Sequence, residues 1–251
     1  MILDIHSHIL FGMDDGAQTL DHSRAMLDAA SDAGISAIVA SPHIYLPPRS
    51  GEQSGDGTVS RYRDETQYRP LIAPRSRTPI DPERLRAHFE MVRNEANQRG
   101  IDLIPGCELS FKVLEEEGPE AAWTYRIGGT RNVLVEFPFG LRIASHHISL
   151  LDDLLRKNII PIIAHPERYE SFTHDPSTLR ELADIGCRFQ VTARVMRGLS
   201  LPKPIQWLIK MNQLDFLGVD AHTAADYTDA AKIIKKYPQY FSAEKLDRPY
   251  R

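Results

Sequence analysis

The stretch DIHSHILFGMDDGAQ, residues 4–18, puts two histidines on the first apolar run of the chain and two acids in the loop after it. Side chains two residues apart on a β-strand project from the same face, so His6 and His8 are expected to point the same way. Two imidazoles on one face at a strand end are suitable metal ligands, although this spacing alone is a weak signal. Asp15 adds a carboxylate, and either this acid or Asp14 beside it suits the turn before the glycine.

Short apolar runs recur along the chain and alternate with helix-like segments. The runs are continuously apolar, which is typical of a parallel sheet covered by helices. A helix is predicted over residues 81–100, where Asp81 suits the N-cap, Pro82 the first turn and Gly100 the end. The predicted strands are 2–5, 36–41, 101–105, 132–136, 159–164, 188–192 and 215–219, and the further predicted helices are 146–157, 176–186, 202–212 and 227–237.

This order of elements indicates an α/β protein. Seven strands in series favour a distorted (βα)7 barrel, and an open doubly wound sheet is the alternative. Residues 46–80 are rich in Pro, Gly, Ser and Arg and show no periodicity, so they are predicted to be a flexible insertion, either a flap beside the site or a neutral surface loop. We therefore expect one domain over residues 1–251 that carries this insertion.

The composition restricts the compartment and the partners. A formal net charge of −4 provides no basic surface for nucleic acid or an acidic membrane. No apolar run reaches the roughly 18 residues of a membrane helix, and the amino terminus lacks the basic start of a signal peptide. Cys107 and Cys187 cannot build a disulfide framework, which suits a reducing compartment. We expect a cytoplasmic protein without membrane insertion, whose oligomeric state, homo-oligomer included, stays open.

Residues with metal-binding side chains follow most of the predicted strands. The carboxyl ends of parallel barrel strands meet at one face, where active sites of such barrels are built, so these side chains should converge. Glu136 could instead bond to backbone, and Arg168 could pair with Glu136 or Glu167. The predicted metal ligands are His6, His8, Asp15, His43, Glu108, Glu136, His165, Asp220 and His222, with Arg168 beside them.

The remaining histidines stand away from strand ends and are predicted to be surface or packing residues. Cys107 is out of phase with its neighbour Glu108, so it should face the other way as a small buried hydrophobe. The histidines in this group are His22, His88, His146, His147 and His174.

The chemistry of the ligand set points to phosphoryl transfer. Imidazole and carboxylate ligands without thiolate suit Mn, Fe or Zn. Nine ligands exceed the four to six that one ion takes, so two ions are expected and three are an option. Neighbouring ions activate water and hold phosphate oxygens, and Arg168 would clamp a phosphate oxygen bidentately.

The motifs DIHSHILFGMDDGAQ, ASPH, PGCEL, VLVEFPF, IIAHPERY and VDAH occur in this order. The series resembles the PHP (polymerase and histidinol phosphatase) superfamily and, within it, the bacterial capsule and exopolysaccharide tyrosine phosphatases of the CpsB/YwqE-like group. The resemblance implies a distorted seven-stranded barrel and a trinuclear, often manganese-dependent site. It also implies hydrolysis of phosphotyrosine on a bacterial tyrosine kinase that controls polysaccharide export. Carried over by motif, it implies the same nine ligands, with Arg168, Asp220 and His222 as catalytic residues.

Two departures from the group concern the substrate contacts. Members often carry a second arginine shortly after the final DxH, but VDAHTAADYT has none through Tyr227. A basic residue often follows the histidine after the second strand, where this chain has Ile44 and Tyr45. Arginines in the 46–80 insertion are candidates for the missing contact.

Other classes of function compete with the tyrosine phosphatase. A cysteine phosphatase needs Arg six positions after its Cys, where this chain has Val113 and Ala193. An amidohydrolase would usually bridge its metals with a carboxylated lysine, and no predicted strand ends in lysine. A PHP phosphoesterase acting on a small ester such as histidinol phosphate stays open, as does a non-catalytic metal-binding partner protein.

Overall fold

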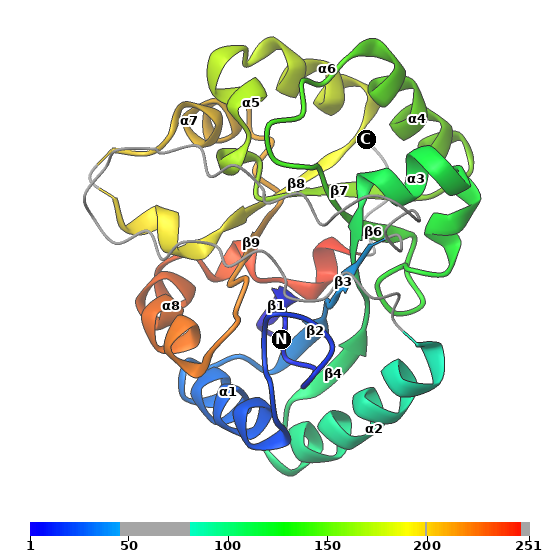
Figure 1. Ribbon diagram of the computed structural model, residues 1–251. Helices are drawn as coiled ribbons and strands as arrows, with labels where there is room; N and C mark the ends of the chain where they lie inside the picture. The colour runs from blue at the N-terminus through cyan, green and yellow to red at the C-terminus, as the bar shows by residue number, and fades with distance from the viewer. Residues whose placement is uncertain (46–80, 199, 247–251) are drawn as a thin grey trace.

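The computed structural model describes residues 1–45, 81–198 and 200–246, and the insertion predicted at 46–80 lies outside these ranges. Strands occupy the middle of the molecule and helices lie around them (Figure 1). This confirms the predicted α/β class.

Every strand pair in the described residues is parallel. One sheet has the order β1-β2-β4 and the other the order β3-β5-β6-β7-β8-β9. The strands are β1 (Leu3–Ser7), β2 (Ala37–Ala40), β3 (His43–Ile44), β4 (Asp102–Pro105), β5 (Glu108–Ser110), β6 (Asn132–Glu136), β7 (Ile160–Ala164), β8 (Arg188–Thr192) and β9 (Phe216–Gly218).

The seven predicted strands are present, and two short strands, β3 and β5, were not predicted as separate elements. The second predicted strand, 36–41, corresponds to β2, and β3 begins after Pro42, which has no N–H to donate to a sheet. The third, 101–105, corresponds to β4, and β5 begins after Gly106, where a Cβ would lie 2.5 Å from Val39 Cγ1. The chain therefore passes from one sheet to the other at these two points.

The predicted helices are all found, and three further helices, α1, α3 and α5, were not predicted. The segment of α1 lacks a broad apolar stripe, and among its buried residues are Ser23 and Ala30. The helices are α1 (Leu20–Asp32), α2 (Pro82–Gln98), α3 (Phe111–Glu117), α4 (Ser145–Arg156), α5 (Glu170–His174), α6 (Ser177–Ile185), α7 (Lys203–Lys210) and α8 (Ala224–Lys236). Short 3-10 turns are η1 (Pro119–Trp123), η2 (Pro166–Arg168), η3 (Ala193–Arg197), η4 (Pro238–Tyr240) and η5 (Ala243–Lys245).

Buried apolar side chains form two clusters that share the strands between them. On β6, Val133 and Val135 belong to the larger cluster, which also includes helix residues, while Leu134 belongs to a smaller one. The smaller cluster also holds Leu3 and Ile5 of β1. Because successive side chains of a strand point to opposite faces, both faces of β6 are covered by apolar packing.

A buried acid joins the start of the chain to its last strand and helix. Asp4 Oδ1 accepts hydrogen bonds from the main-chain N–H of Val219 at 2.8 Å and of His6 at 3.2 Å. The Tyr227 hydroxyl lies 3.0 Å from Asp4 Oδ2 and 2.9 Å from Ser7 Oγ. Burial raises the pKa of Asp4 to about 6. These bonds fix β1 against the segment that follows β9 and against α8.

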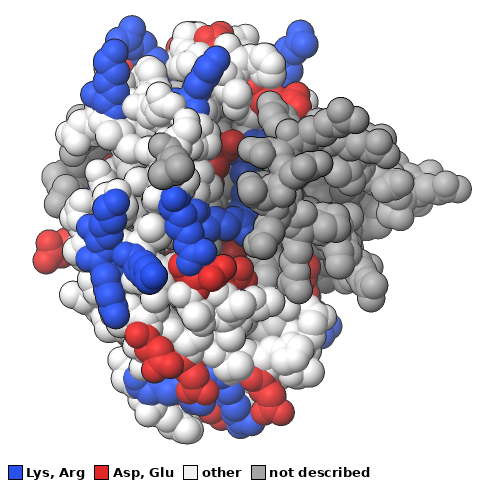
Figure 2. All heavy atoms as spheres, turned by 90° about the vertical axis from the view of Figure 1, so that its left-hand side faces the viewer, with Lys and Arg blue, Asp and Glu red and all other residues white. Residues whose placement is uncertain are grey.

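Within the described ranges, no helix combines the length and the apolar character needed to cross a membrane. Basic and acidic side chains lie interspersed on the face shown in Figure 2. Cys107 and Cys187 are buried and free, which confirms the packing role predicted for Cys107.

Replacing Tyr227 by Phe should lower the free energy of unfolding by about 1–3 kcal/mol, because Asp4 and Ser7 would lose a buried hydrogen-bond partner. Denaturant titration measures the change. The matched control is Tyr237→Phe, whose ring is only half-buried, with an expected change within about 0.5 kcal/mol. Equal stability of the two variants would contradict the role assigned to the Asp4 network.

Candidate metal centre

The nine predicted ligands lie together, in or after strands β1, β3, β5, β6, β7 and β9. Each belongs to a group whose ligand atoms all lie within 4.8 Å of one another. The groups share members, so they form one continuous cluster. They are His8, Asp15, His43 and His222; His6, Glu108 and His165; His6, His8 and Asp220; and His43, Glu108 and Glu136.

Glu108, the first residue of β5, lies in the middle of the cluster. Its Oε2 is 3.1 Å from His6 Nε2, 3.1 Å from His43 Nδ1 and 3.4 Å from His8 Nε2. Its Oε1 is 2.8 Å from His165 Nε2. Burial disfavours the ionised carboxylate, but the surrounding imidazoles, His6 and His43 first, hold the pKa of Glu108 well below its usual range.

Asp220 approaches the same imidazoles from the segment after β9. Its Oδ1 lies 3.4 Å from His6 Nε2 and 3.3 Å from His8 Nε2. Burial opposes ionisation, and Arg168 and His6 hold the pKa of Asp220 well below its usual range. Asp220 and His165 have positive φ angles of 56° and 31°, which are uncommon for residues other than glycine. Such backbone strain is concentrated at functional sites.

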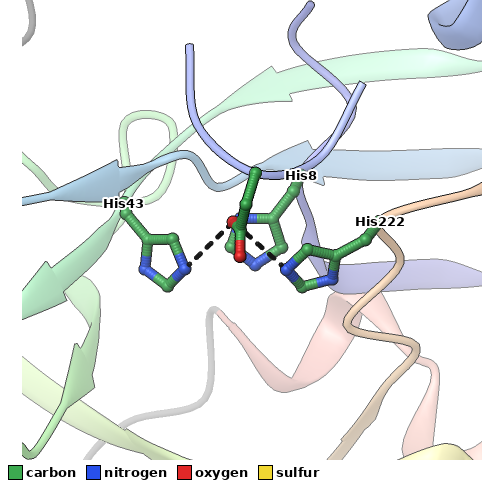
Figure 3. A group of neighbouring side chains, drawn as sticks. His8, His43 and His222 are labelled. Atoms are coloured by element: carbon green, nitrogen blue, oxygen red, sulfur yellow. Dashed lines mark ion pairs between the residues drawn. The ribbon is translucent and has the colours of Figure 1, made fainter. Parts of the chain in front are cut away.

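A second part of the cluster surrounds Asp15. Its Oδ1 lies 3.6 Å from His43 Nε2 and 3.4 Å from His222 Nε2. Figure 3 shows the rings of His8, His43 and His222 gathered around this position, and the His8 and His222 rings are stacked at a centroid distance of 4.1 Å. Asp15 Oδ1 is buried and has no hydrogen-bond partner in the described structure.

Each of four imidazoles has an oxygen atom within hydrogen-bonding distance of its Nδ1. The Nε2 atom of each ring then faces the carboxylates. Metal-ligating histidines usually have such a partner, because it fixes the tautomer and the ring orientation. Asp14 is one of these partners, so of the two adjacent acids Asp15 faces the cluster and Asp14 supports it. The pairs are His6 with Gln190 Oε1 at 3.0 Å, His8 with Asp14 Oδ2 at 2.8 Å, His165 with Tyr169 Oη at 3.3 Å, and His222 with the Asp220 main-chain oxygen at 3.1 Å.

The residues present fit a group of divalent cations. His6 Nε2 and His8 Nε2 lie 3.2 Å apart, and both face the carboxylates of Glu108 and Asp220. Lone pairs that point at one another repel unless a cation lies between them. A cation there would also give Asp15 Oδ1 a partner. Glu108 belongs to two of the groups and could bridge two ions.

Glu136, the last residue of β6, completes the side of the cluster near His43. Its Oε2 lies 3.6 Å from His43 Nδ1 and its Oε1 lies 3.8 Å from His165 Nε2. Tyr45 donates a hydrogen bond to Glu136 Oε2 at 3.1 Å, and its hydroxyl is 3.0 Å from His43 Nδ1. Burial and the charge of Glu108 raise the pKa of Glu136 well above its usual range. Sequence reasoning assigned Tyr45 no role, and nothing in the sequence shows that its hydroxyl reaches the site.

Arg168 lies at the edge of the cluster, in η2 after β7. Its guanidinium contacts Asp220 Oδ2 and donates to Thr192 Oγ1 at 3.3 Å. Glu167, one of the two acids considered from the sequence as partners of Arg168, accepts a hydrogen bond from the main-chain N–H of Thr192 at 3.0 Å. The contact with Asp220 was not predicted from the sequence.

The histidines predicted to lie outside the site do so. His22, His146 and His174 are exposed, and His88 stacks on Phe11. His147 forms a smaller group with Glu115 and His146 that could hold a metal. However, His147 Nδ1 accepts from the Ala144 main-chain N–H and its Nε2 faces Glu115 at 3.2 Å, so both ring nitrogens are already engaged.

The family model described as Capsular polysaccharide synthesis, CpsB/CapC, matches residues 2–66 and 70–243. The chain belongs to this family. Tyrosine-protein phosphatase YwqE of Bacillus subtilis (strain 168) is 29% identical over 226 residues, which are 88% of this chain and 77% of that protein. Tyrosine-protein phosphatase CpsB of Streptococcus pneumoniae is 28% identical over 194 residues, which are 76% of this chain and 68% of that protein. The predicted resemblance is therefore confirmed.

Two solved structures are similar to this CpsB/CapC chain. One comes from crystal structures of YwqE from Bacillus subtilis and CpsB from Streptococcus pneumoniae, described as unique metal-dependent tyrosine phosphatases. It matches with a TM-score of 0.70 and 26% identity, over 97% of this chain and 90% of that one. Histidinol phosphate phosphatase from Lactococcus lactis, complexed with zinc, L-histidinol and phosphate, matches with a TM-score of 0.53 and 17% identity, over 98% and 99%. The second likeness shows the fold alone.

Replacing Gly16 by Ala should disrupt the loop that carries Asp14 and Asp15. A Cβ at Gly16 would lie 2.0 Å from the main-chain oxygen and 2.4 Å from Cβ of His8, so the loop must move. We expect about 1–3 kcal/mol of destabilisation and a lower metal content after dialysis, measured by denaturant titration and elemental analysis. Gly129→Ala is the control, because a Cβ there meets no atom within 4 Å. Metal retention equal to that of the control would show that the loop does not position the ligands.

Proposed function

We propose that this protein is a metal-dependent protein-tyrosine phosphatase acting on a bacterial tyrosine kinase that regulates capsule or exopolysaccharide synthesis. The observation that carries the proposal is the cluster around Glu108, in which histidines and acids from several strand ends meet beside Arg168. Membership of the CpsB/CapC family and similarity to proteins named tyrosine-protein phosphatase support the same substrate class.

Manganese is the proposed metal, as two or three ions, with iron or zinc as alternatives. The proposed ligands are His6, His8, Asp15, His43, Glu108, Glu136, His165, Asp220 and His222. Ions bound there would activate water and polarise the phosphate. The protein fixes the orientation of the ligands, because Asp14 and Tyr169 contact the Nδ1 atoms of two of the imidazoles.

Arg168 is the residue proposed to bind the substrate phosphate. Its guanidinium is fixed by Thr192 Oγ1 and by Asp220, at the edge of the cluster. A planar guanidinium can donate two parallel hydrogen bonds to phosphate oxygens and stabilise the charge that spreads over them during transfer. Asp220 and His222 are proposed as catalytic residues beside it. The tyrosyl leaving group has a pKa near 10, so its departure needs only moderate assistance.

An exposed aromatic ring beside the cluster favours an aromatic phosphate ester over a small polar one. Phe139, three residues after Glu136, is 54% exposed, and its ring centroid lies 6.2 Å from that of Tyr169. The Tyr169 hydroxyl in turn reaches His165. A phenyl ring attached to a phosphate at the metal centre could pack on such a surface.

We also propose one cytoplasmic domain whose two sheets act as one distorted seven-stranded barrel. In support, β2 and β3 follow one another in the chain, as do β4 and β5. An isolated parallel bridge joins Ser7 of β1 to Ala221 after β9, and Asp220 N–H donates to the His6 main-chain oxygen at 2.8 Å.

Chelator-stripped protein with manganese restored should release phosphate from a phosphotyrosine peptide and only weakly from histidinol phosphate. Phosphate release is the measurement, with zinc and iron(II) compared in parallel. Preference for the small ester would be consistent with the metal centre but would contradict the proposed phosphotyrosine substrate. No release from either ester would favour a non-catalytic metal-binding role.

Replacing Arg168 by Ala should reduce kcat/KM for the peptide about 100-fold or more, because a guanidinium aimed at the phosphate is lost. Metal content by elemental analysis should stay that of the unmodified protein, because Arg168 is not a proposed ligand. Arg180→Ala, at an exposed position of α6, is the matched control. Unchanged turnover in Arg168→Ala would remove this residue from the mechanism.

A further inference from the structure

We propose that Gln190, in the middle of β8, is a positioning residue that selects the metal-binding tautomer of His6 and fixes the backbone of His165. The proposal rests on the metal centre of the proposed function. None of the nine proposed ligands comes from β8, so Gln190 would be the support that this strand gives to the ligands themselves.

The contacts of Gln190 determine how its amide is oriented. The side chain is fully buried, and Oε1 lies 3.0 Å from His6 Nδ1 and 3.4 Å from the main-chain nitrogen of His165. A main-chain N–H can only donate, so the amide atom that faces it must be the oxygen. The same oxygen faces His6 Nδ1, which is therefore the protonated nitrogen of that ring.

This tautomer leaves His6 Nε2 with a free lone pair. Nε2 is the ring atom that faces Glu108 Oε2 at 3.1 Å and Asp220 Oδ1 at 3.4 Å. The opposite tautomer would direct an N–H into the carboxylates, and Nε2 could not bind a cation. Gln190 also holds the nitrogen of His165, whose φ of 31° places a second ligand in an uncommon conformation.

The packing around Gln190 argues against a purely structural role. Its Nε2 is buried and has no acceptor in the described structure, which is unfavourable for a core residue. Gly218 of β9 makes room for the amide, because a Cβ there would lie 2.7 Å from Gln190 Nε2 and 2.9 Å from His6 Cβ. An apolar side chain would avoid the unpaired donor, but it could not accept from His6 and His165.

Metal titration of the chelator-stripped full chain tests the proposal. Gln190→Met removes the acceptor at nearly constant length and should weaken manganese binding about 10–100-fold in calorimetry, the range typical of lost ligand-supporting partners. Gln190→Glu keeps an acceptor facing both donors and should stay within about 3-fold of the unmodified protein. Gln206→Met, at an exposed position of α7, is the control and should bind as the unmodified protein does.

A second readout separates positioning from general loss of structure. In zinc-loaded protein, histidine nitrogen NMR should report His6 protonated at Nδ1 in the unmodified chain and in Gln190→Glu, and a mixture of tautomers in Gln190→Met. Thermal unfolding identifies variants that do not fold. If Gln190→Met is one of them, Gln190→Asn replaces it, because the shorter side chain withdraws the oxygen.

Unweakened manganese binding in the variant without the acceptor would overturn the proposal. So would equal losses in Gln190→Met and Gln190→Glu. These measurements need no phosphatase activity, so failure of the unmodified protein to hydrolyse phosphotyrosine would reject the proposed function separately.

Discussion

The contact of one buried carboxylate, Glu108, with four imidazoles is the constraint on which the rest of the polar centre depends. An ionised carboxylate is unfavourable in an apolar interior unless opposite charge and hydrogen-bond donors surround it. His6, His8, His43 and His165 provide that surrounding. The first two lie at the end of β1, His43 begins β3 and His165 follows β7. The strands must therefore end close together, and the break between β4 and β5 places Glu108 where all four rings can reach it.

A second set of residues keeps the rings in place. Asp14, Gln190 and Tyr169 each present an oxygen to the side of an imidazole that faces away from the carboxylates. Each is buried or nearly so, and each comes from a different segment of the chain. The orientation of the imidazole rings thus depends on three segments, which are the loop after β1, strand β8 and the turn after β7.

Much of the fold and of the candidate site could be predicted because parallel strands have a direction. Once the strands were placed, residues such as His43 and Glu136 had to meet at one end, whatever their separation in sequence. The supporting contacts follow no such rule. Which of Asp14 and Asp15 faces the cluster depends on a loop held by the close approach of Gly16 to His8. Gln190 lies inside a strand and not at its end, so a search of strand ends could not find it.

The network around Asp4 has a consequence for the order of folding. The hydrogen bonds from Val219 and Tyr227 to Asp4 span 215 and 223 residues of sequence. Contacts of such long range form late and slowly, because the intervening chain must be ordered first. Asp220 and His222 are made more than 200 residues after His6 and His8. The complete centre can therefore assemble only after Asp220 and His222 have been made, and metal capture by His6 and His8 alone would use an incomplete ligand set.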